Sequence, residues 1–337
     1  MHFATTALIA TLAAGVPLAP GATAASPAAM PAANVQTQVE APGPAGPLRG
    51  RHQSPAQVRA VVVMLPGSGP TDRDGNSPLG VNGAPYRLLA EGLAARGIAT
   101  IRTDKRGLFG SAGAVADANG VSMTDYAADV HQWVRVARAR TGAPCAWVLG
   151  HSEGGLVALV AAQQPQDICG LILVSASGRP FGALIREQLT SNPANAPVLD
   201  EAMAALDSLE AGRRVDTTGM NPALLPLFAP PVQDYFIRLM AYDPAALMRT
   251  VRIPVLIVQG QRDLQVREVD ARTLAAANPA ARLVLVADAN HVLKAVATDD
   301  RAANAATYGD PTLGLAPGIV EPIAEFVAAP PAGAGAD

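Results

Sequence analysis

Short apolar runs recur along the chain and alternate with longer stretches in which apolar and polar residues mix. The run Ala60–Leu65 (AVVVML) is apolar at every position, as expected for a strand buried on both faces of a sheet. Five more segments are strand candidates: Ile98–Thr103, Ala146–Leu149, Leu171–Val174, Pro254–Val258 and Leu283–Val286. Strands that alternate with helical patterns are typical of a mostly parallel sheet flanked by helices, so we predict an α/β fold.

One helical pattern is especially regular. Ser122 is a suitable N-cap for a helix, and Asp125 places a negative charge in its first turn. Apolar residues then follow at spacings of three and four, which puts them on one face of the helix: Met123, Tyr126, Val130, Trp133, Val134 and Ala137.

Residues 177–250 interrupt the alternation, because they contain no convincing strand. Their short helical patterns are punctuated by Pro193, Pro197, Pro222, Pro226, Pro230 and Pro231. We predict a helical insertion that acts as a lid or cap, since long insertions in compact domains are usually functional. The alternative is that these helices only cover the sheet. The predicted core on either side of this insertion consists of residues 58–176 and 251–330.

The two ends of the chain have a different composition. Residues 1–24 resemble a secretory signal peptide, with the apolar run Ala7–Val16 and a small-residue cleavage site at Ala22–Ala24. They predict an exported protein, periplasmic or secreted. Residues 25–57 are predicted to be a linker and N-terminal segment, because residues 20–47 are rich in Ala, Pro and Gly and almost uncharged. Residues 331–337 are predicted to be a disordered tail.

Overall composition excludes several classes of function. The net charge is −3 and only 16% of the 337 residues are charged, which argues against a nucleic-acid-binding surface. Ala7–Val16 is too short to cross a bilayer, and no other apolar stretch is long enough, so no membrane span is predicted. The sequence has no C-x-x-C motif and no Cys/His cluster, so a structural zinc site is not expected, and the chemistry argued below needs neither a metal nor an organic cofactor.

The segment Val148–Gly155 (VLGHSEGG) contains the clearest chemical signal. It places Ser152 between a predicted strand and a helical pattern, with Gly150 and Gly154 two residues away on either side. This G-x-S-x-G spacing is the nucleophile elbow, in which glycines allow a tight turn that exposes the serine hydroxyl above the sheet. Ser152 is therefore our candidate nucleophile, and a plain glycine-lined turn is the alternative.

A serine nucleophile needs a general base and a carboxylate that orients the base. The chain has five histidines, and elimination favours His291, which follows the last predicted strand. The favoured carboxylate is Asp263, just after the preceding strand, and its rival Asp288 lies only three residues before the histidine. The order Ser152, Asp263, His291 along the chain is that of one fold class.

Acyl transfer also requires hydrogen-bond donors for the developing oxyanion. The backbone amide of Glu153, which follows the nucleophile, is one candidate. A second is expected in the glycine-containing loop after the first strong strand, where Ser68 is the first choice and Gly69 the second. A phosphate-binding loop is a weak alternative, because the P-loop pattern is absent.

Taken together, these segments resemble the α/β-hydrolase superfamily, and within it bacterial serine esterases close to the EstD-type carboxylesterases. The resemblance rests on PGSGPTDRDGN (66–76), TDKRGLFGS (103–111), GHSEGG (150–155), GQRD (260–263) and NHVLK (290–294). It implies the triad Ser152, Asp263 and His291, an oxyanion hole near Ser68 and Glu153, and hydrolysis of short-chain acyl esters. Asp74 and Arg106 are expected to brace loops around the site rather than to react. Residues 177–250 match nothing specific.

Cys145 and Cys169 each stand at the start of a predicted strand. These strands are expected to be neighbours, close enough for a disulfide if the side chains face each other. Export would permit a disulfide, but we favour two buried free thiols.

The leading interpretation is thus a serine carboxylic ester hydrolase acting on a small-molecule ester. A peptidase or amidase of the same fold is the main alternative, because the acyl step is shared. A binding protein on a hydrolase scaffold is disfavoured, since all three triad members are present. An epoxide or haloalkane hydrolase is also disfavoured, because such enzymes need a carboxylate where this chain has Ser152.

Overall fold

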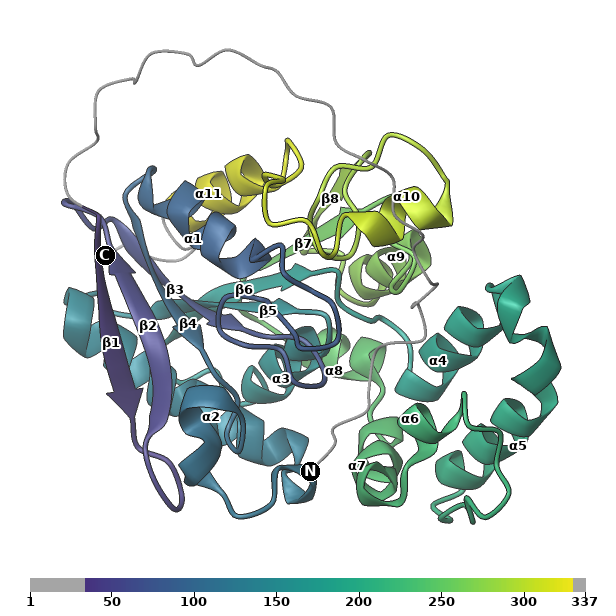
Figure 1. Cartoon of the computed structure of the whole chain (residues 1–337). Helices are drawn as coiled ribbons and strands as arrows, with labels where there is room; N and C mark the ends of the chain where they lie inside the picture. Colours follow the sequence, from purple (N-terminus) through teal and green to yellow (C-terminus); the bar gives the residue numbers. More distant parts are fainter. Residues whose placement is uncertain (1–33, 330–337) are drawn as a thin grey trace.

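A central sheet of eight strands organises the chain in a computed structural model, which describes residues 34–329 (Figure 1). The strand order is β1-β2-β4-β3-β5-β6-β7-β8. All pairs from β4 to β8 are parallel, whereas β1 pairs with β2 and β2 with β4 in antiparallel fashion. The bounds are β1 Val35–Ala41, β2 Leu48–Ser54, β3 Ala60–Leu65, β4 Ile98–Thr103, β5 Ala146–His151, β6 Ile168–Val174, β7 Val255–Gly260 and β8 Arg282–Val286. Each of the six predicted strands is present.

Alternate residues of the central strands belong to two separate cores. In β3, Val61 and Val63 pack in one hydrophobic cluster, while Val62 and Met64 pack in the other. Successive side chains of a strand point to opposite faces, so a strand with helices on both sides buries side chains on both faces and favours apolar residues at every position. This explains the continuous apolar run in the sequence.

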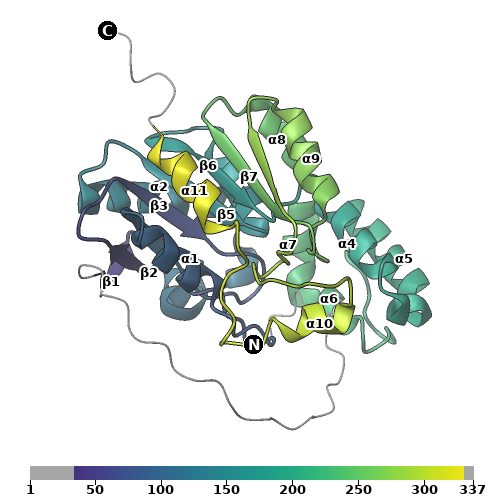
Figure 2. The ribbon, with the colours of Figure 1, turned by 90° about the horizontal axis from the view of Figure 1, so that it is seen from above.

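Helices cover both faces of the sheet (Figures 1 and 2). On one face lie α1 (Pro85–Ala94) and α11 (Val320–Ala328). The opposite face is covered by α2 (Met123–Thr141), α3 (Glu153–Ala161), α8 (Pro244–Thr250) and α9 (Glu268–Ala277). Short elements complete the core: η1 (Phe109–Ala114), η2 (Ala118–Gly120) and α10 (Arg301–Ala306).

The predicted helix 123–137 is α2, and its start follows the expected chemistry. The Ser122 hydroxyl accepts a hydrogen bond from the Asp125 amide, and the Asp125 carboxylate accepts one from the Ser122 amide. This reciprocal capping box satisfies two amides that the first turn leaves without helical partners. Gly142, with φ 72°, ends the helix.

The insertion 177–250 is helical throughout its regular structure. It contains α4 (Phe181–Thr190), η3 (Pro193–Val198), α5 (Leu199–Glu210), α6 (Leu225–Phe228) and α7 (Pro230–Met240), followed by α8, which returns to the sheet. In Figure 1, α4 to α7 stand to one side of the sheet. Their buried side chains, such as Leu206 and Phe236, belong to the same hydrophobic cluster as one face of the sheet.

The N-terminal prediction is wrong for residues 34–54. The linker was predicted to span residues 25–57, but Val35–Ala41 and Leu48–Ser54 form the edge strands β1 and β2. Most of β1 is exposed, and only Val39 and Ala41 are buried, so the segment lacks a continuous apolar run. Gly50 has structural meaning in β2, because a Cβ there would lie 3.0 Å from the indole of Trp133 in α2.

The cysteine prediction is also wrong, because Cys145 and Cys169 form a disulfide rather than two free thiols. Cys145 immediately precedes β5 and Cys169 lies near the start of the adjacent strand β6. The predicted signal peptide 1–24 and tail 331–337 lie outside the described residues. Within residues 34–329, no helix combines the length and apolar character needed to cross a membrane.

Candidate active site

Ser152 occupies the sharp turn between β5 and α3. Its backbone has φ 53° and ψ −121°, a conformation that costs a non-glycine residue on the order of 1–3 kcal/mol and persists only where the surroundings enforce it. The Ser152 amide donates to the Val174 carbonyl of β6 (3.0 Å), which fixes the turn to the neighbouring strand. Ser152 therefore has the backbone strain expected of a nucleophile elbow.

The glycines around Ser152 are required by close backbone contacts. A Cβ on Gly150 would lie 2.1 Å from the Gly154 carbonyl oxygen, and a Cβ on Gly154 would lie 2.6 Å from the Leu65 carbonyl oxygen. A Cβ on Gly155 would lie 2.4 Å from the Ala176 side chain. Contacts this short cannot be relieved without moving the backbone, so the sequence GHSEGG encodes the turn sterically.

Asp263 and His291 meet at the ends of β7 and β8. The Nδ1 atom of His291 lies 2.8 Å from Oδ2 of Asp263, and both side chains are buried. The other oxygen of Asp263 accepts hydrogen bonds from the amides of Gln265 (2.8 Å) and Val266 (2.9 Å). The rival carboxylate, Asp288, is exposed.

The charge state of Asp263 fixes the tautomer of His291. Burial alone would raise the pKa of Asp263, but His291 and the two amide donors together lower the pKa below its ordinary value. An ionised carboxylate only accepts hydrogen bonds, so Nδ1 of His291 is the donor, and in the neutral imidazole the lone pair is on Nε2. A histidine in this state can act as a general base.

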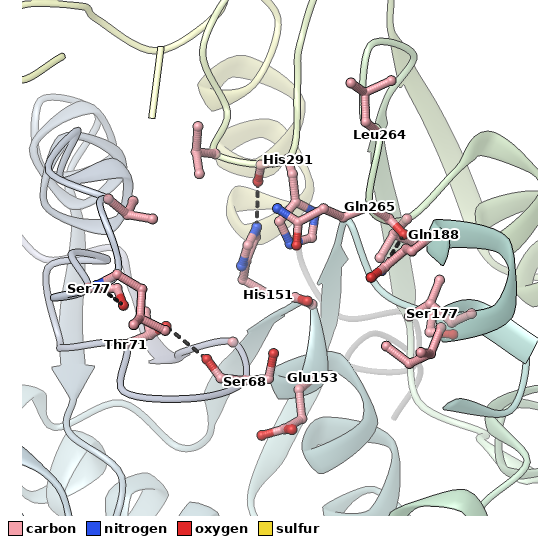
Figure 3. Close-up of a pocket in the computed structure, with 18 of the residues that line it drawn as sticks. Ser68, Thr71, Ser77, His151, Glu153, Ser177, Gln188, Leu264, Gln265 and His291 are labelled. Carbon is pink, nitrogen blue, oxygen red and sulfur yellow. Dashed lines mark hydrogen bonds between the residues drawn. The ribbon is translucent and has the colours of Figure 1, made fainter. Parts of the chain in front are cut away.

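His151 lies directly before the nucleophile but has a different environment (Figure 3). Its Nε2 atom is 2.8 Å from the carbonyl oxygen of His291 and must donate to it. Its Nδ1 atom, 2.9 Å from the Tyr86 hydroxyl, is therefore the acceptor of the phenolic proton. Burial, with the nearby His291, lowers the pKa of His151 to about 3. His151 is thus a neutral link between the elbow and the backbone of His291.

The loop after β3 approaches the elbow closely. A Cβ on Gly67 would lie 3.3 Å from the Ser152 Cβ, so only glycine leaves ordinary space there. The Gly67 amide donates to the Tyr86 hydroxyl (3.1 Å), and Ser68 follows it in the loop. The Ser68 carbonyl accepts from Thr71 Oγ1 (2.9 Å; Figure 3).

A single pocket of about 610 Å³ contains Ser152 and His291 together with Ser68 and Glu153. Gly69, the second choice for the oxyanion donor, is not among the described residues that line this pocket. The core contributes Tyr86 and Val292, and the insertion contributes a largely apolar wall of Phe181, Leu184, Ile185, Leu189, Leu227 and Leu239. The volume falls in the range of small-molecule sites.

Asp74 and Arg106 do not line the pocket, and their contacts are those of braces. Asp74 forms an ion pair with the buried Arg102 of β4. Arg106 binds Asp129 of α2 through Nε (2.7 Å) and Nη2 (2.5 Å). These contacts hold the loops after β3 and β4 against the core, as the sequence predicts. No group of three His, Cys, Asp or Glu side chains suited to a metal ion occurs among residues 34–329.

Two residues that make several contacts at the site are not among the site residues predicted from the sequence. Tyr86 joins the Gly67 amide to His151, and no local pattern predicts this role for a tyrosine at the start of α1. Lys105 contacts both the Gly67 carbonyl and Glu153. The sequence held a signal for Lys105, because it lies in the segment TDKRGLFGS and is one of only two lysines, Lys105 and Lys294.

Comparison with known proteins places these features in context. Residues 80–196, which include Ser152 but neither Asp263 nor His291, match the serine aminopeptidase S33 family. Esterase EstD of Thermotoga maritima is 28% identical over 214 residues, which are 62% of this chain and 48% of that protein. The chain thus spans about half the length of the curated relative that it matches.

Solved structures show the same fold at low sequence identity. Est1E of Butyrivibrio proteoclasticus is 16% identical, with a TM-score of 0.53 over 87% of this chain and 99% of that one. A complex of DcsB with its substrate analogue is also 16% identical, with a TM-score of 0.57 over 87% of this chain and 98% of that one. At this identity the likeness shows the fold alone, and chemistry must be argued from the site.

Proposed function

We propose that this chain, which has the α/β-hydrolase fold and is distantly similar to esterase EstD, hydrolyses carboxylic esters with Ser152 as nucleophile. The observation that carries the proposal is the buried Asp263–His291 hydrogen bond of 2.8 Å in the pocket that also contains the strained Ser152. This combination places the Ser152 side chain in one cavity with a histidine suited to act as base, which an ionised acid orients.

The mechanism follows from these positions. Ser152 Oγ attacks the acyl carbon while Nε2 of His291 takes its proton, which then passes to the leaving alcohol. Asp263 stabilises the imidazolium, and the amides of Ser68 and Glu153 bind the oxyanion. Glu153 begins α3, so its amide also carries the positive end of the helix dipole. Water activated by His291 then releases the acid.

An ester is favoured over a peptide with a free amino terminus by the charges of the pocket. Among the described residues that line it, Glu153 is the one carboxylate, and Lys105 pairs with it. Two arginines, Arg179 and Arg301, also line the pocket. An ammonium group would need an unpaired acidic partner there. The acidic side chains of the insertion lie outside this lining, and Asp207, Glu210 and Asp234 pair with arginines.

The substrate is proposed to carry a short acyl chain, as the resemblance implies. A pocket of about 610 Å³ is larger than an acetyl group requires, so we propose that the remaining apolar space takes a bulkier alcohol group. The insertion supplies most of this wall, and we propose that it acts as the lid that encloses the substrate.

Hydrolysis of p-nitrophenyl esters from acetate to palmitate, compared with aminoacyl anilides, tests this proposal. We expect short esters to be cleaved by the wild type, and kcat to fall by about 10⁴-fold or more in Ser152→Ala. Ester turnover that survives in Ser152→Ala would remove Ser152 as the nucleophile. Anilide cleavage faster than ester cleavage would favour the aminopeptidase activity named by the matching family.

Export is a separate proposal. It is supported by the signal-like sequence of residues 1–24 and by the Cys145–Cys169 disulfide, because disulfides persist mainly in oxidising compartments. N-terminal sequencing of protein from the periplasm and medium of a bacterial host is expected to find a chain that begins after Ala24. A chain that stays in the cytoplasm and keeps Met1 would contradict export.

A further inference from the structure

Lys105 reaches both backbone segments from which the oxyanion donors come. It follows β4, and its side chain is only 8% exposed. Nζ donates to the carbonyl oxygen of Gly67 at 2.7 Å and lies 3.3 Å from Oε1 of Glu153. Gly67 directly precedes Ser68 in the loop after β3, and Glu153 directly follows the nucleophile. One ammonium group therefore connects the two arms of the proposed oxyanion hole.

The ion pair of Lys105 and Glu153 also determines the net charge next to the proposed oxyanion hole. The Glu153 side chain is 6% exposed, and Lys105 is the only cation that pairs with it among the described residues. A buried carboxylate beside a developing oxyanion would repel it strongly, because charges in a low-dielectric site are weakly screened. Lys105 compensates this negative charge at its source.

Two phenols near the pair are neutral. The ring of Tyr126 lies 5.8 Å from Lys105 Nζ. Burial raises the pKa of Tyr126 and that of Tyr235 in α7, and the Glu153 carboxylate raises both further. Both phenols therefore keep their protons and contribute no charge. The charge of Glu153 is therefore compensated by Lys105 and not by these phenols.

We propose that Lys105 is a positioning residue of the oxyanion hole, which holds the Gly67 peptide in place and neutralises Glu153; this inference rests on the proposed function. A lysine suits the task because its compact ammonium has three donors and can serve a carbonyl and a carboxylate together. Its neighbours face elsewhere, since Asp104 accepts from the Arg73 amide (2.9 Å) and Arg106 binds Asp129.

Two substitutions separate the positioning effect from the charge effect. Lys105→Met removes the donor to Gly67 and leaves the Glu153 carboxylate unpaired, so we expect kcat for a short p-nitrophenyl ester to fall about 100-fold with KM within about twofold. Adding Glu153→Gln removes the unpaired charge. The double variant is expected to recover about tenfold in kcat and to stay about tenfold below the wild type, because Gly67 still lacks its donor.

Equal kcat values for Lys105→Met and the double variant would overturn the charge argument, and a double variant with wild-type kcat would overturn the positioning argument. If Lys105→Met does not fold, the double variant carries the test alone, because it buries no unpaired charge. Arg138→Met is the control, since it breaks the ion pair with Asp167, which touches neither Gly67 nor Glu153 and does not line the pocket. It should leave kcat within about twofold.

The wild type and Ser152→Ala are measured in the same series. Absence of Ser152-dependent ester hydrolysis in the wild type would overturn the proposed function. Ser152-dependent hydrolysis that Lys105→Met leaves unchanged would overturn the role of Lys105 alone.

Discussion

His151 and His291 lie with their rings 4.8 Å apart, yet their environments give them different chemistry. His291 has an ionised carboxylate on Nδ1, which supports a positive charge on the ring during catalysis. The Tyr86 hydroxyl lies at Nδ1 of His151 and the His291 carbonyl lies at Nε2. If Nδ1 were protonated, it could no longer accept the phenolic proton, and the Tyr86 hydroxyl would have to reorient. Adjacent histidines can therefore serve as base and as neutral brace.

The neutral state of His151 has a consequence for stability against pH. The pKa of His151 is about 3 in the fold, against an ordinary value of 6.5. Between these values the unfolded chain binds a proton that the folded chain does not. The free energy of unfolding therefore falls as the pH drops below 6.5, and the contribution of His151 is fully present above that pH. The contribution to the slope is up to about 1.4 kcal/mol per pH unit.

Urea unfolding from pH 4 to 7.5 checks this. His151→Gln keeps a donor and an acceptor but does not titrate, so we expect it to flatten the acid limb of the stability curve. Parallel curves for the wild type and His151→Gln would mean that His151 does not contribute to acid sensitivity.

At the scale of elements, the strands differ in how clearly their local sequence predicts their place in the sheet. Strands β3 to β7 are buried on both faces; β3 is apolar along its length, whereas β4 also buries Thr100 and Arg102. The hairpin β1–β2 closes one edge of the sheet; β1 is mostly exposed and β2 buries the polar His52 and Gln53, so neither strand has a continuous apolar run. The disulfide ties β5 to β6 at the edge opposite Ser152, because both cysteines lie where these strands begin.

This position predicts an effect on stability without an effect on chemistry. The two cysteines are 24 residues apart, and closing a loop of this length stabilises a fold by about 3 kcal/mol in the chain-entropy account. Replacing both with serine should lower the free energy of unfolding by about this amount. The value of kcat should be unaffected.

Urea titrations with and without dithiothreitol provide the measurement and its control. Reductant should destabilise the wild type but leave the double serine variant unchanged. A wild type that is insensitive to complete reduction would contradict a stabilising role for the disulfide.

At the scale of the whole molecule, the insertion is anchored where it leaves the sheet. The buried carboxylate of Asp270 in α9 accepts hydrogen bonds from the Gly178 amide (3.1 Å) and from the amide (3.2 Å) and Nε (3.0 Å) of Arg179. Arg179 also pairs with Glu187 of α4. One carboxylate of the core thus fixes the first turn of the segment that walls the pocket.

Asp270→Ala should therefore loosen the insertion. The change leaves Arg179 and two backbone amides without their acceptor, and we expect a loss of about 2–4 kcal/mol in unfolding free energy. Limited proteolysis is expected to cut within residues 177–250 before it cuts the core. The exposed carboxylate of Asp207, whose side chain is 70% exposed in its pair with Arg186, provides the control.

Asp207→Ala should change stability by less than about 1 kcal/mol and leave the proteolysis pattern unaltered. Cleavage of Asp270→Ala at the rate and sites of the wild type would show that the insertion is held by its apolar contacts and not by this anchor.

The sequence alone determined the features that depend on neighbours along the chain. The apolar runs predicted six strands, because strands buried on two faces admit few polar residues. The glycines around Ser152 predicted the elbow, because they are imposed by steric contacts within a few residues. The order of strands also suggested that Asp263 and His291 approach Ser152.

Only the tertiary structure decided the features that depend on partners distant in the chain. Tyr86 and His151 are 65 residues apart, and Lys105 lies 38 residues from Gly67 and 48 from Glu153. The disulfide forms only because the starts of β5 and β6 lie side by side. Strand β1 forms only because β2 offers it a partner at the edge of the sheet. Such contacts depend on register and packing, which no local pattern encodes, because a side chain's partner is fixed only when the sheet has brought the segments together.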